Sequence, residues 1–141
     1  MRHPQLLLDN QLCHRIYMAN HNLNKVYSTL LEPLQLTYPQ YVVMMALWQQ
    51  DQITLSQLSE RTRIDAGTLS LMVKKLTDKN LIDVRPGEDD KRQRVVHLTE
   101  PGEALADQAS NLPEQVLCAF PTLDQDELKT LAQLLDKLNQ A

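Results

Sequence analysis

The stretch TLSQLSERTRIDAGTLSLMVKKLTDKNLIDVRPGEDDKRQRVVHL, residues 54–98, decides the fold. Thr54 and Gln57 have the spacing of a capping box, which predicts that a short helix starts here. Asp65 suits the N-cap of a second helix, which we predict over 66–79. The apolar positions of that second helix recur at helical spacing on one face: Leu69, Met72, Val73 and Leu76.

A β-hairpin is predicted after these two helices. Residues 81–85 and 93–98 are rich in Val and Ile with partial alternation, which favours two strands. The polar, charged segment 86–91 joins them, and Ile53 is a candidate for one further short strand. Two helices followed by a hairpin make a winged helix-turn-helix, so the predicted fold class is mainly α with a small sheet.

Helical patterns also precede this core. Residues 9–31 predict a long first helix, which Glu32–Pro33 ends because proline cannot continue the ladder of hydrogen bonds. Thr37 or Tyr38 opens a second helix that is apolar nearly all round as far as Trp48. We expect that second helix to be buried.

Two further helices are predicted after the hairpin. One starts at Thr99 and reaches about Phe120, and Pro113 should kink or interrupt it. The last opens at 121–124 and carries an amphipathic stripe made of Leu128, Leu131, Leu134, Leu135 and Leu138. Because the terminal helices are too apolar on one face to stand alone, we predict that they pack against a second copy in a two-fold homodimer.

The composition is that of an ordinary globular protein. Of the 141 residues, 43% are hydrophobic and 23% are charged. No signal-peptide pattern and no membrane-spanning stretch is recognisable, so we expect a single cytoplasmic domain over 1–141 without a membrane partner. Neither Cys13 nor Cys118 has a His or Cys at zinc-ligand spacing, and we therefore predict no metal and no cofactor.

Charge is unevenly distributed along the chain. The net charge is −4, but nine basic and six acidic residues give residues 61–94 a charge of +3, which leaves −7 for the remainder. A positive central segment is where a phosphate backbone would dock. We therefore predict that about 37–100 form a core that binds double-stranded DNA, with 5–34 and 101–141 as dimerisation helices.

The helix predicted over 66–79 begins with small and polar side chains. Such side chains let a helix N-terminus approach base edges and phosphates. Arg92 and Arg94 of the hairpin suit phosphates or a minor groove. Asp90 is predicted to hold Arg92 or the hairpin in shape through a charge-assisted hydrogen bond. A dimer presents two such helices about one DNA turn apart, which predicts a palindromic operator. The predicted DNA contacts are Ala66, Gly67, Thr68, Ser70, Lys74, Lys75, Arg92 and Arg94.

The order of elements, together with Asp90-Lys91-Arg92 and Leu98-Thr99-Glu100, resembles the MarR family over nearly the whole chain. Four segments resemble more narrowly the organic-hydroperoxide resistance regulators (OhrR) of that family: Asn10-Gln11-Leu12-Cys13, Leu31-Glu32-Pro33-Leu34, Leu36-Thr37-Tyr38-Pro39-Gln40-Tyr41 and Asp65-Ala66-Gly67-Thr68-Leu69. The resemblance implies a repressor that leaves DNA when an organic hydroperoxide oxidises its N-terminal cysteine.

The chain departs from the OhrR pattern in the region predicted to contact DNA. Ala66 stands where Ser is frequent, and Ser70-Leu71 stands where Thr-Pro is common. Arg94 replaces the apolar residue that the wing usually carries. The base preference therefore does not follow from the resemblance, whereas DNA binding does.

Cys13 is the sensing cysteine that the resemblance implies, and the two assisting tyrosines of the pattern correspond to Tyr17 and Tyr27. A peroxide sensor needs a thiolate, which phenol hydroxyls stabilise by donating hydrogen bonds to sulfur. Tyr17 is one helical turn from Cys13, whereas Tyr27 is 14 residues away, about 21 Å along a straight helix. Tyr27 must then come from the partner subunit, or the helix must bend sharply.

Cys118 corresponds to the resolving cysteine of the two-cysteine OhrR branch. The resemblance implies that a sulfenic acid on Cys13 condenses with Cys118 of the other subunit to form a disulfide. The alternative for both residues is that they are inert cysteines of the core.

Three other functions are compatible with the sequence. A MarR-type repressor controlled by a small phenolic or other ligand would leave Cys13 incidental. A thiol peroxidase is disfavoured, because the Thr-x-x-Cys arrangement and the arginine of an efficient peroxidase are missing, and we predict no enzymatic activity. A winged helix that binds another protein would show no salt-dependent affinity for DNA.

Overall fold

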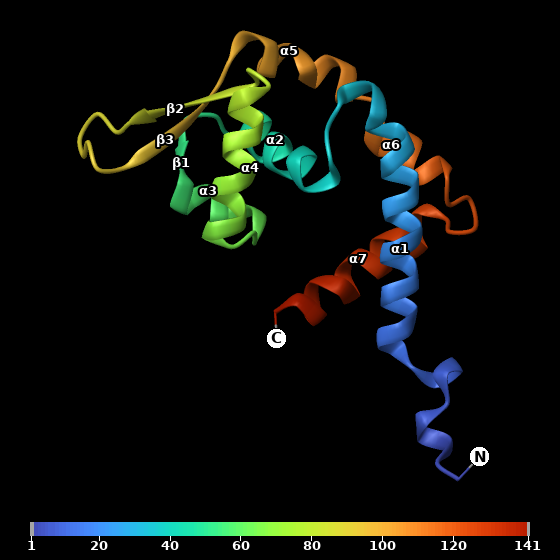
Figure 1. Cartoon of the computed structure of the whole chain (residues 1–141). Coiled ribbons are helices and arrows are strands. Elements are labelled where there is room, and N and C mark those ends of the chain that lie inside the picture. The colour runs from blue at the N-terminus through green and yellow to red at the C-terminus, as the bar shows by residue number, and fades with distance from the viewer. Residues whose placement is uncertain (1, 141) are drawn as a thin grey trace. The chain divides into compact units, whose positions relative to one another are not determined.

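The computed structural model describes residues 2–140, which are mainly helical with one small sheet (Figure 1). Two compact units meet in sequence between Ser110 and Asn111. The first unit contains helices α1 to α5 and the sheet, and the second contains α6 and α7. No helix within residues 2–140 is long and apolar enough to cross a membrane.

Helix α1 spans Leu12–Leu30 and starts three residues later than the sequence predicted. Two short 3-10 turns, Pro4–Leu6 and Leu8–Asn10, precede it. The side-chain amide of Gln11 donates to the carbonyl oxygens of Gln5 and Leu7, at 3.0 and 2.8 Å. These bonds hold the chain ahead of α1 in tighter turns, which explains why the helical pattern overestimated its length.

Helix α2 spans Tyr38–Gln49 and is capped by Thr37. The Thr37 hydroxyl accepts from the backbone N–H of Gln40 at 3.3 Å, and the Gln40 side chain accepts from the backbone N–H of Thr37 at 3.2 Å. This reciprocal pair satisfies two of the N–H groups that a helix start leaves unpaired. The predicted burial is confirmed, since the side chains of Val43, Met44 and Leu47 are completely buried.

The two helices of the central stretch are α3, Leu55–Thr62, and α4, Ala66–Asp78. The predicted capping box at the start of α3 is confirmed, and Asp65 caps α4 as predicted. Arg63 adopts a left-handed conformation with φ of 60° and turns the chain between the two helices. Asn80, just after α4, also has a φ of 60°, a conformation that Asn adopts more readily than most residues.

The sheet has three antiparallel strands in the order β1-β3-β2. Strand β1 is Ile53–Thr54, β2 is Ile82–Pro86 and β3 is Arg94–Leu98. Val96 of β3 pairs with Ile53 on one side and with Val84 on the other. The predicted hairpin and the short third strand are therefore confirmed, and Figure 1 shows the hairpin extending away from α2, α3 and α4.

One core joins these helices to the sheet. It is formed by side chains with less than 2% exposure, among them Met44, Leu47, Leu58, Leu69, Leu76, Ile82 and Val96. The face that α4 turns toward this core determines the face that it leaves in solvent.

Helix α5, Glu100–Ala109, follows β3 directly and is capped by Thr99. The indole N–H of Trp48 donates to the carbonyl of Gly102 at 2.9 Å and so ties α2 to α5. A Cβ at Gly102 would lie 2.0 Å from the carbonyl oxygen of Leu81. Only glycine allows α5 to approach the segment ahead of β2 so closely.

The second unit consists of α6, Leu112–Cys118, and α7, Gln125–Asn139. The single long helix predicted to about Phe120 is interrupted after Ala109, and Pro113 lies in the first turn of α6. Asp124 caps α7, where it forms a capping box with Glu127. The leucine stripe of α7 stays largely in solvent: Leu131, Leu134, Leu135 and Leu138 are between 37% and 56% exposed.

Candidate nucleic-acid interface and cysteine sites

Helix α4 leaves its polar and basic face in solvent. Leu69, Val73 and Leu76 point into the core, which fixes the rotation of the helix about its axis. The predicted DNA contacts on this helix are consequently all exposed: Ala66, Gly67, Thr68, Ser70, Lys74 and Lys75. Core packing thus presents the small first turn and both lysines on one accessible surface.

The start of α4 is held by Asp65. Its carboxylate accepts from the backbone N–H of Thr68 at 3.0 Å and from the Thr68 hydroxyl at 2.6 Å. These hydrogen bonds from Thr68 stabilise the ionised form and lower the pKa of Asp65. Because the hydroxyl proton of Thr68 is engaged with Asp65, its oxygen can offer an outside partner only a lone pair.

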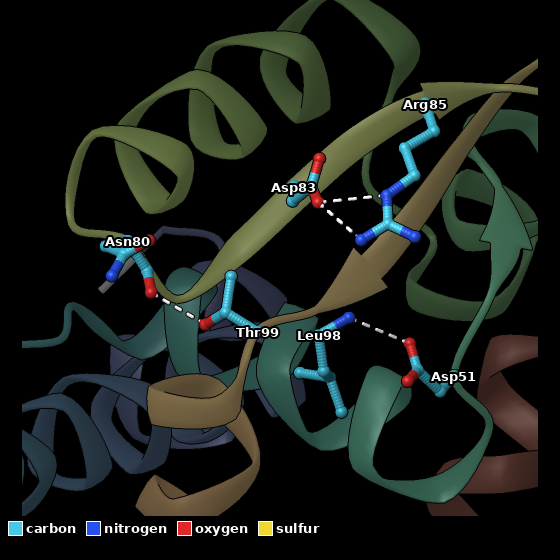
Figure 2. Close-up of polar contacts among 6 residues, drawn as sticks. All are labelled: Asp51, Asn80, Asp83, Arg85, Leu98 and Thr99. Atoms are coloured by element: carbon cyan, nitrogen blue, oxygen red, sulfur yellow. Dashed lines mark hydrogen bonds and ion pairs between the residues drawn. The ribbon is translucent and has the colours of Figure 1, made fainter.

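The base of the wing, the β2–β3 hairpin, is fastened by polar contacts that Figure 2 shows. The carboxylate of Asp51 accepts from the backbone N–H of Leu98 at 2.9 Å, and the Thr99 hydroxyl donates to the carbonyl of Asn80 at 2.7 Å. Asp51 was not singled out from the sequence, where Asp51-Gln52 only indicated a turn. Its partner lies 47 residues away, so no local pattern marks the contact.

Asp83 and Arg85 form an ion pair on β2. Arg85 donates to one oxygen of Asp83 from Nη2 at 2.8 Å and from Nε at 3.0 Å (Figure 2). Both side chains are more than 40% exposed, so solvent screens the pair and its contribution to stability is small.

The tip of the wing carries Asp90 and Arg92. One oxygen of Asp90 accepts from the backbone N–H of Arg92 at 3.0 Å and from its Nε at 3.3 Å. The Arg92 side chain is 93% exposed. A Cβ at Gly87 would lie 2.5 Å from the Asp90 carbonyl oxygen, so this turn requires glycine. The structure therefore places Asp90 against Arg92, and its wing-structuring role stays a prediction.

A surface hollow of about 600 Å³ lies between α4 and the sheet. Ser70 and Lys74 of α4 line it together with Arg94 of β3. Three of the predicted DNA contacts are thus brought together, whereas Arg92 lies beyond them at the tip of the wing.

Cys13 is the second residue of α1, and its side chain is exposed and unbonded. Tyr17, one turn further on, is 67% exposed and stacks between His14 and His21, with ring centroids 6.1 and 6.5 Å apart. Cys118 is the last residue of α6 and is also an exposed free cysteine. Neither cysteine is a buried core residue in this structure.

Tyr27 lies near the other end of α1, which is unbroken from Leu12 to Leu30. Tyr27 is therefore about 21 Å from its own Cys13 along the helix axis. Its ring packs instead against Tyr38 and Tyr41 of α2, with centroids 4.6 and 5.9 Å away. Burial and these two neighbouring phenols raise the pKa of Tyr27. The phenol consequently stays a neutral hydrogen-bond donor over a wider pH range.

Tyr38 is a further candidate functional residue, and its contact with Tyr27 was not predicted from the sequence. An open groove of about 860 Å³ lies against the tyrosine pair and is lined by α1, α2 and the segment between them. Asn20, Asn24 and Ser28 add polar groups to its wall. Only the i, i+3 spacing of Tyr38 and Tyr41 on α2 could have hinted at this cluster.

A helix-turn-helix packed on an antiparallel wing, with a basic helix face turned to solvent, defines a winged-helix DNA-binding protein. Residues 36–93 match the model of the MarR family. The organic hydroperoxide resistance transcriptional regulator of Bacillus subtilis is 35% identical over 136 residues, which cover 94% of this chain and 92% of that regulator. The chain belongs to the MarR family.

Other relatives support this assignment. The regulator MgrA of Staphylococcus aureus is 33% identical over 135 residues, which cover 95% of this chain and 91% of MgrA. BpsR of Bordetella bronchiseptica, whose DNA binding is regulated by 6-hydroxynicotinic acid, has a TM-score of 0.89 at 26% identity and covers 96% of this chain and 97% of its own.

Two similar structures contain DNA. A mutant MarR from E. coli complexed with operator DNA has a TM-score of 0.83 at 29% identity, covering 90% of this chain and 92% of its own. Reduced AbfR bound to DNA has a TM-score of 0.80 at 25% identity, covering 99% and 95%. The chain is a MarR-type DNA-binding transcriptional regulator, and regulators of this family are not enzymes.

Proposed function

We propose that the chain is a two-cysteine regulator of the OhrR type, a homodimeric repressor that leaves a palindromic operator when an organic hydroperoxide oxidises Cys13. The observation that carries the proposal is an exposed, free Cys13 at the start of α1 in a chain 35% identical to a hydroperoxide-resistance regulator over nearly its whole length. An exposed thiol meets the first requirement of a sensor, which is access for the peroxide.

The proposed sensor spans two subunits. Because α1 is unbroken, Tyr27 cannot reach its own Cys13. Cys13 and Tyr27 lie seven residues to either side of Asn20. If two copies of α1 cross antiparallel near Asn20, Cys13 of one subunit faces Tyr27 of the partner subunit. The Tyr27–Tyr38 pair then supplies phenol donors to the thiolate, while Tyr17 lies one turn from Cys13 on the same helix.

The chemistry needs only the thiols and the peroxide. The Cys13 thiolate attacks one peroxide oxygen, the O–O bond breaks, and the alcohol leaves after taking up a proton, so that Cys13 becomes a sulfenic acid. The Cys118 thiol of the partner subunit then attacks the Cys13 sulfur and releases water, which forms an intersubunit disulfide. The two electrons that reduce the peroxide come first from Cys13, and the disulfide shares the oxidation between both sulfurs.

Dimerisation is proposed from the unpartnered apolar surface. Leu12, Ile16 and Leu23 of α1 are between 37% and 62% exposed, and the leucine stripe of α7 is similarly exposed. Apolar surface of this kind, rimmed by polar residues, is typical of an interface. A two-fold dimer buries it and sets two α4 helices about one DNA turn apart.

DNA docking is proposed at the exposed face of α4 and at the wing. Ala66, Gly67, Thr68 and Ser70 would approach base edges in the major groove, and Lys74 and Lys75 would contact phosphates. Arg92 and Arg94 extend the contact to the backbone or to an adjacent minor groove, with Asp90 shaping the turn.

The experiment is fluorescence anisotropy of the reduced protein on DNA from its own promoter, before and after one equivalent of cumene hydroperoxide, with reductant added last. We expect tight binding that is lost on oxidation and restored by reductant. Cys13→Ser should bind and ignore peroxide, and Cys118→Ser should respond without forming an intersubunit disulfide on a non-reducing gel. Release of Cys13→Ser by peroxide at the wild-type dose would contradict the proposal.

A second candidate function rests on the groove beside Tyr27 and Tyr38. Its volume of about 860 Å³ and its phenol and amide groups suit a small aromatic ligand, as in a repressor controlled by a phenolic compound. The likeness to BpsR, which 6-hydroxynicotinic acid regulates, favours the same class of ligand. Release of Cys13→Ser from DNA by such a compound, with peroxide inert on the wild type, would establish this function instead.

A further inference from the structure

Leu71 is an apolar side chain at the centre of the polar face of α4. It is 63% exposed. Successive residues of a helix are about 100° apart, so Leu71 lies about 200° from both Leu69 and Val73, which are buried. Its rotamers therefore point directly away from the core that fixes α4.

The neighbours of Leu71 on this face are suited to nucleic acid. Gly67 lies one turn before it and adds no side chain, so a DNA surface can come close there. Lys74 and Lys75 lie one turn after it, exposed and free to meet phosphates. Leu71 thus lies between Gly67, where the helix backbone can come close to DNA, and the two lysines, whose charges would fix the register of the helix on DNA.

We propose that Leu71 contacts the C5-methyl group of a thymine in the major groove and is a specificity-determining residue for the operator. The thymine methyl is the apolar group that a base pair presents in that groove, and apolar side chains recognise it. Ser70-Leu71 is also where the sequence departs from the hydroperoxide-regulator pattern, so the base preference at this position does not follow from that pattern.

The proposal depends on DNA binding by α4 and not on the redox chemistry of Cys13. It can therefore be tested with the reduced protein alone, under conditions in which the thiol sensor plays no part. Failure of the sensor proposal would leave it standing, and the reverse is equally true.

The test removes the methyl group from the DNA. Operators are first selected from random duplexes with the reduced protein, and each thymine of one half-site is then replaced singly by deoxyuridine, which lacks only the C5-methyl. Wild-type protein should lose about fourfold in affinity at one position, the factor that corresponds to ~0.8 kcal/mol for one buried methyl-sized group. Replacing the symmetric thymine as well should bring the loss to about sixteenfold.

Leu71→Ala completes a double-mutant cycle between the side chain and the thymine methyl group. It should bind the unmodified operator several-fold more weakly and be indifferent to deoxyuridine at the position that wild type senses. Leu71→Met, which keeps an apolar side chain of similar reach, should retain the sensitivity. Leu6→Ala is the matched control, since Leu6 is 64% exposed but lies in the first 3-10 turn, outside α4.

Two results would overturn the proposal while leaving DNA binding intact. One is wild-type affinity that is unchanged by deoxyuridine at every thymine, which needs no variant to interpret. The other is an equal deoxyuridine penalty in wild type and Leu71→Ala, which would assign the methyl contact to another residue.

Discussion

Helices α2 and α7 are both rich in apolar residues, yet the structure treats them differently. Helix α2 is apolar nearly all round and is enclosed by the winged-helix core, with Val43, Met44 and Leu47 fully buried. Helix α7 is apolar on one side only, and none of its residues, all of which the structure describes, is buried. A helix with apolar residues on every side specifies a core, whereas a single stripe specifies one partner surface.

The same contrast separates two parts of the first unit, the winged-helix core and α1. The central stretch buries side chains of α2, α3, α4 and the sheet in one core, while α1 buries none of its residues from Leu12 to Leu30. We propose that the exposed apolar residues of α1 and α7 pack against a second chain.

Leu134→Asp should abolish the proposed dimer. Leu134 is 56% exposed on α7, and burying one leucine contributes about 1.5–3 kcal/mol, so two symmetric copies contribute about 3–6 kcal/mol. The dissociation constant should rise by at least about 100-fold. Sedimentation should show the mass fall from twice 16.2 kDa to 16.2 kDa.

The control for this variant is Gln133→Asp, which places the same charge on the opposite side of α7. It should leave the dimer unchanged, because Gln133 lies well outside the leucine stripe. Equal dissociation by both variants would show that net charge, and not the apolar stripe, holds the copies together.

Leu47→Ala should destabilise the winged-helix core. Leu47 has 0% exposure, and truncating a fully buried leucine leaves a cavity that costs about 2–5 kcal/mol of the free energy of unfolding. Urea denaturation followed by circular dichroism measures the loss. Leu71→Ala, at an exposed position, should change the midpoint little, and a comparable loss there would mean that Leu71 packs more tightly than its exposure indicates.

Asp51→Ala should loosen the wing without disturbing the terminal helices. It removes the acceptor of the Leu98 N–H, and an unsatisfied backbone donor costs about 1–3 kcal/mol. Hydrogen exchange should show faster exchange at Leu98 than in the wild type. Asp83→Ala, which breaks only an exposed ion pair, should cost less than about 1 kcal/mol. The reverse order of the two losses would contradict the role of Asp51 as an anchor.

The smallest effect is expected at Tyr27, where the terminal helix meets the core. Its pKa is raised by burial and by Tyr38 and Tyr41, so the folded state holds the phenol proton more tightly than the unfolded chain. The resulting stability is present below the ordinary tyrosine pKa of about 10 and is lost as pH rises through the folded value. The part of the tyrosinate absorbance that is lost in Tyr27→Phe should therefore titrate above the ordinary tyrosine pKa. Titration below the ordinary pKa would contradict the packing of Tyr27 against Tyr38 and Tyr41.

Local patterns made most of the fold predictable. The caps Thr54 and Asp65 lie within three residues of the groups they bind, and the hairpin is marked by its strands and its polar turn. The predicted start of α1 was wrong. The side chain of Gln11 holds the preceding residues in tighter turns, and apolar periodicity does not reveal this contact.

Long-range contacts were not predictable in the same way. Lys79 donates to the side-chain oxygen of Gln40 at 3.0 Å and to the carbonyl of Gln35, which joins the end of α4 to the start of α2 across about forty positions. The Tyr27–Tyr38 contact depends on how α1 and α2 cross. The two partners of such a contact show no regular spacing in the sequence. The residues of the candidate site were therefore predicted from their types, whereas their contacts with one another were predicted only in part.

Gly102 sets a limit on how this gene can vary. It touches neither DNA nor a thiol in any role proposed above, yet a single added methyl would meet the Leu81 carbonyl at 2.0 Å, while its own carbonyl receives the Trp48 indole. In a library of random coding changes selected only for operator binding under reducing conditions, position 102 should therefore be intolerant of replacement, whereas position 13 should tolerate it. Sequence constancy there would reflect the space between two backbones and would say nothing about the signal that the protein detects.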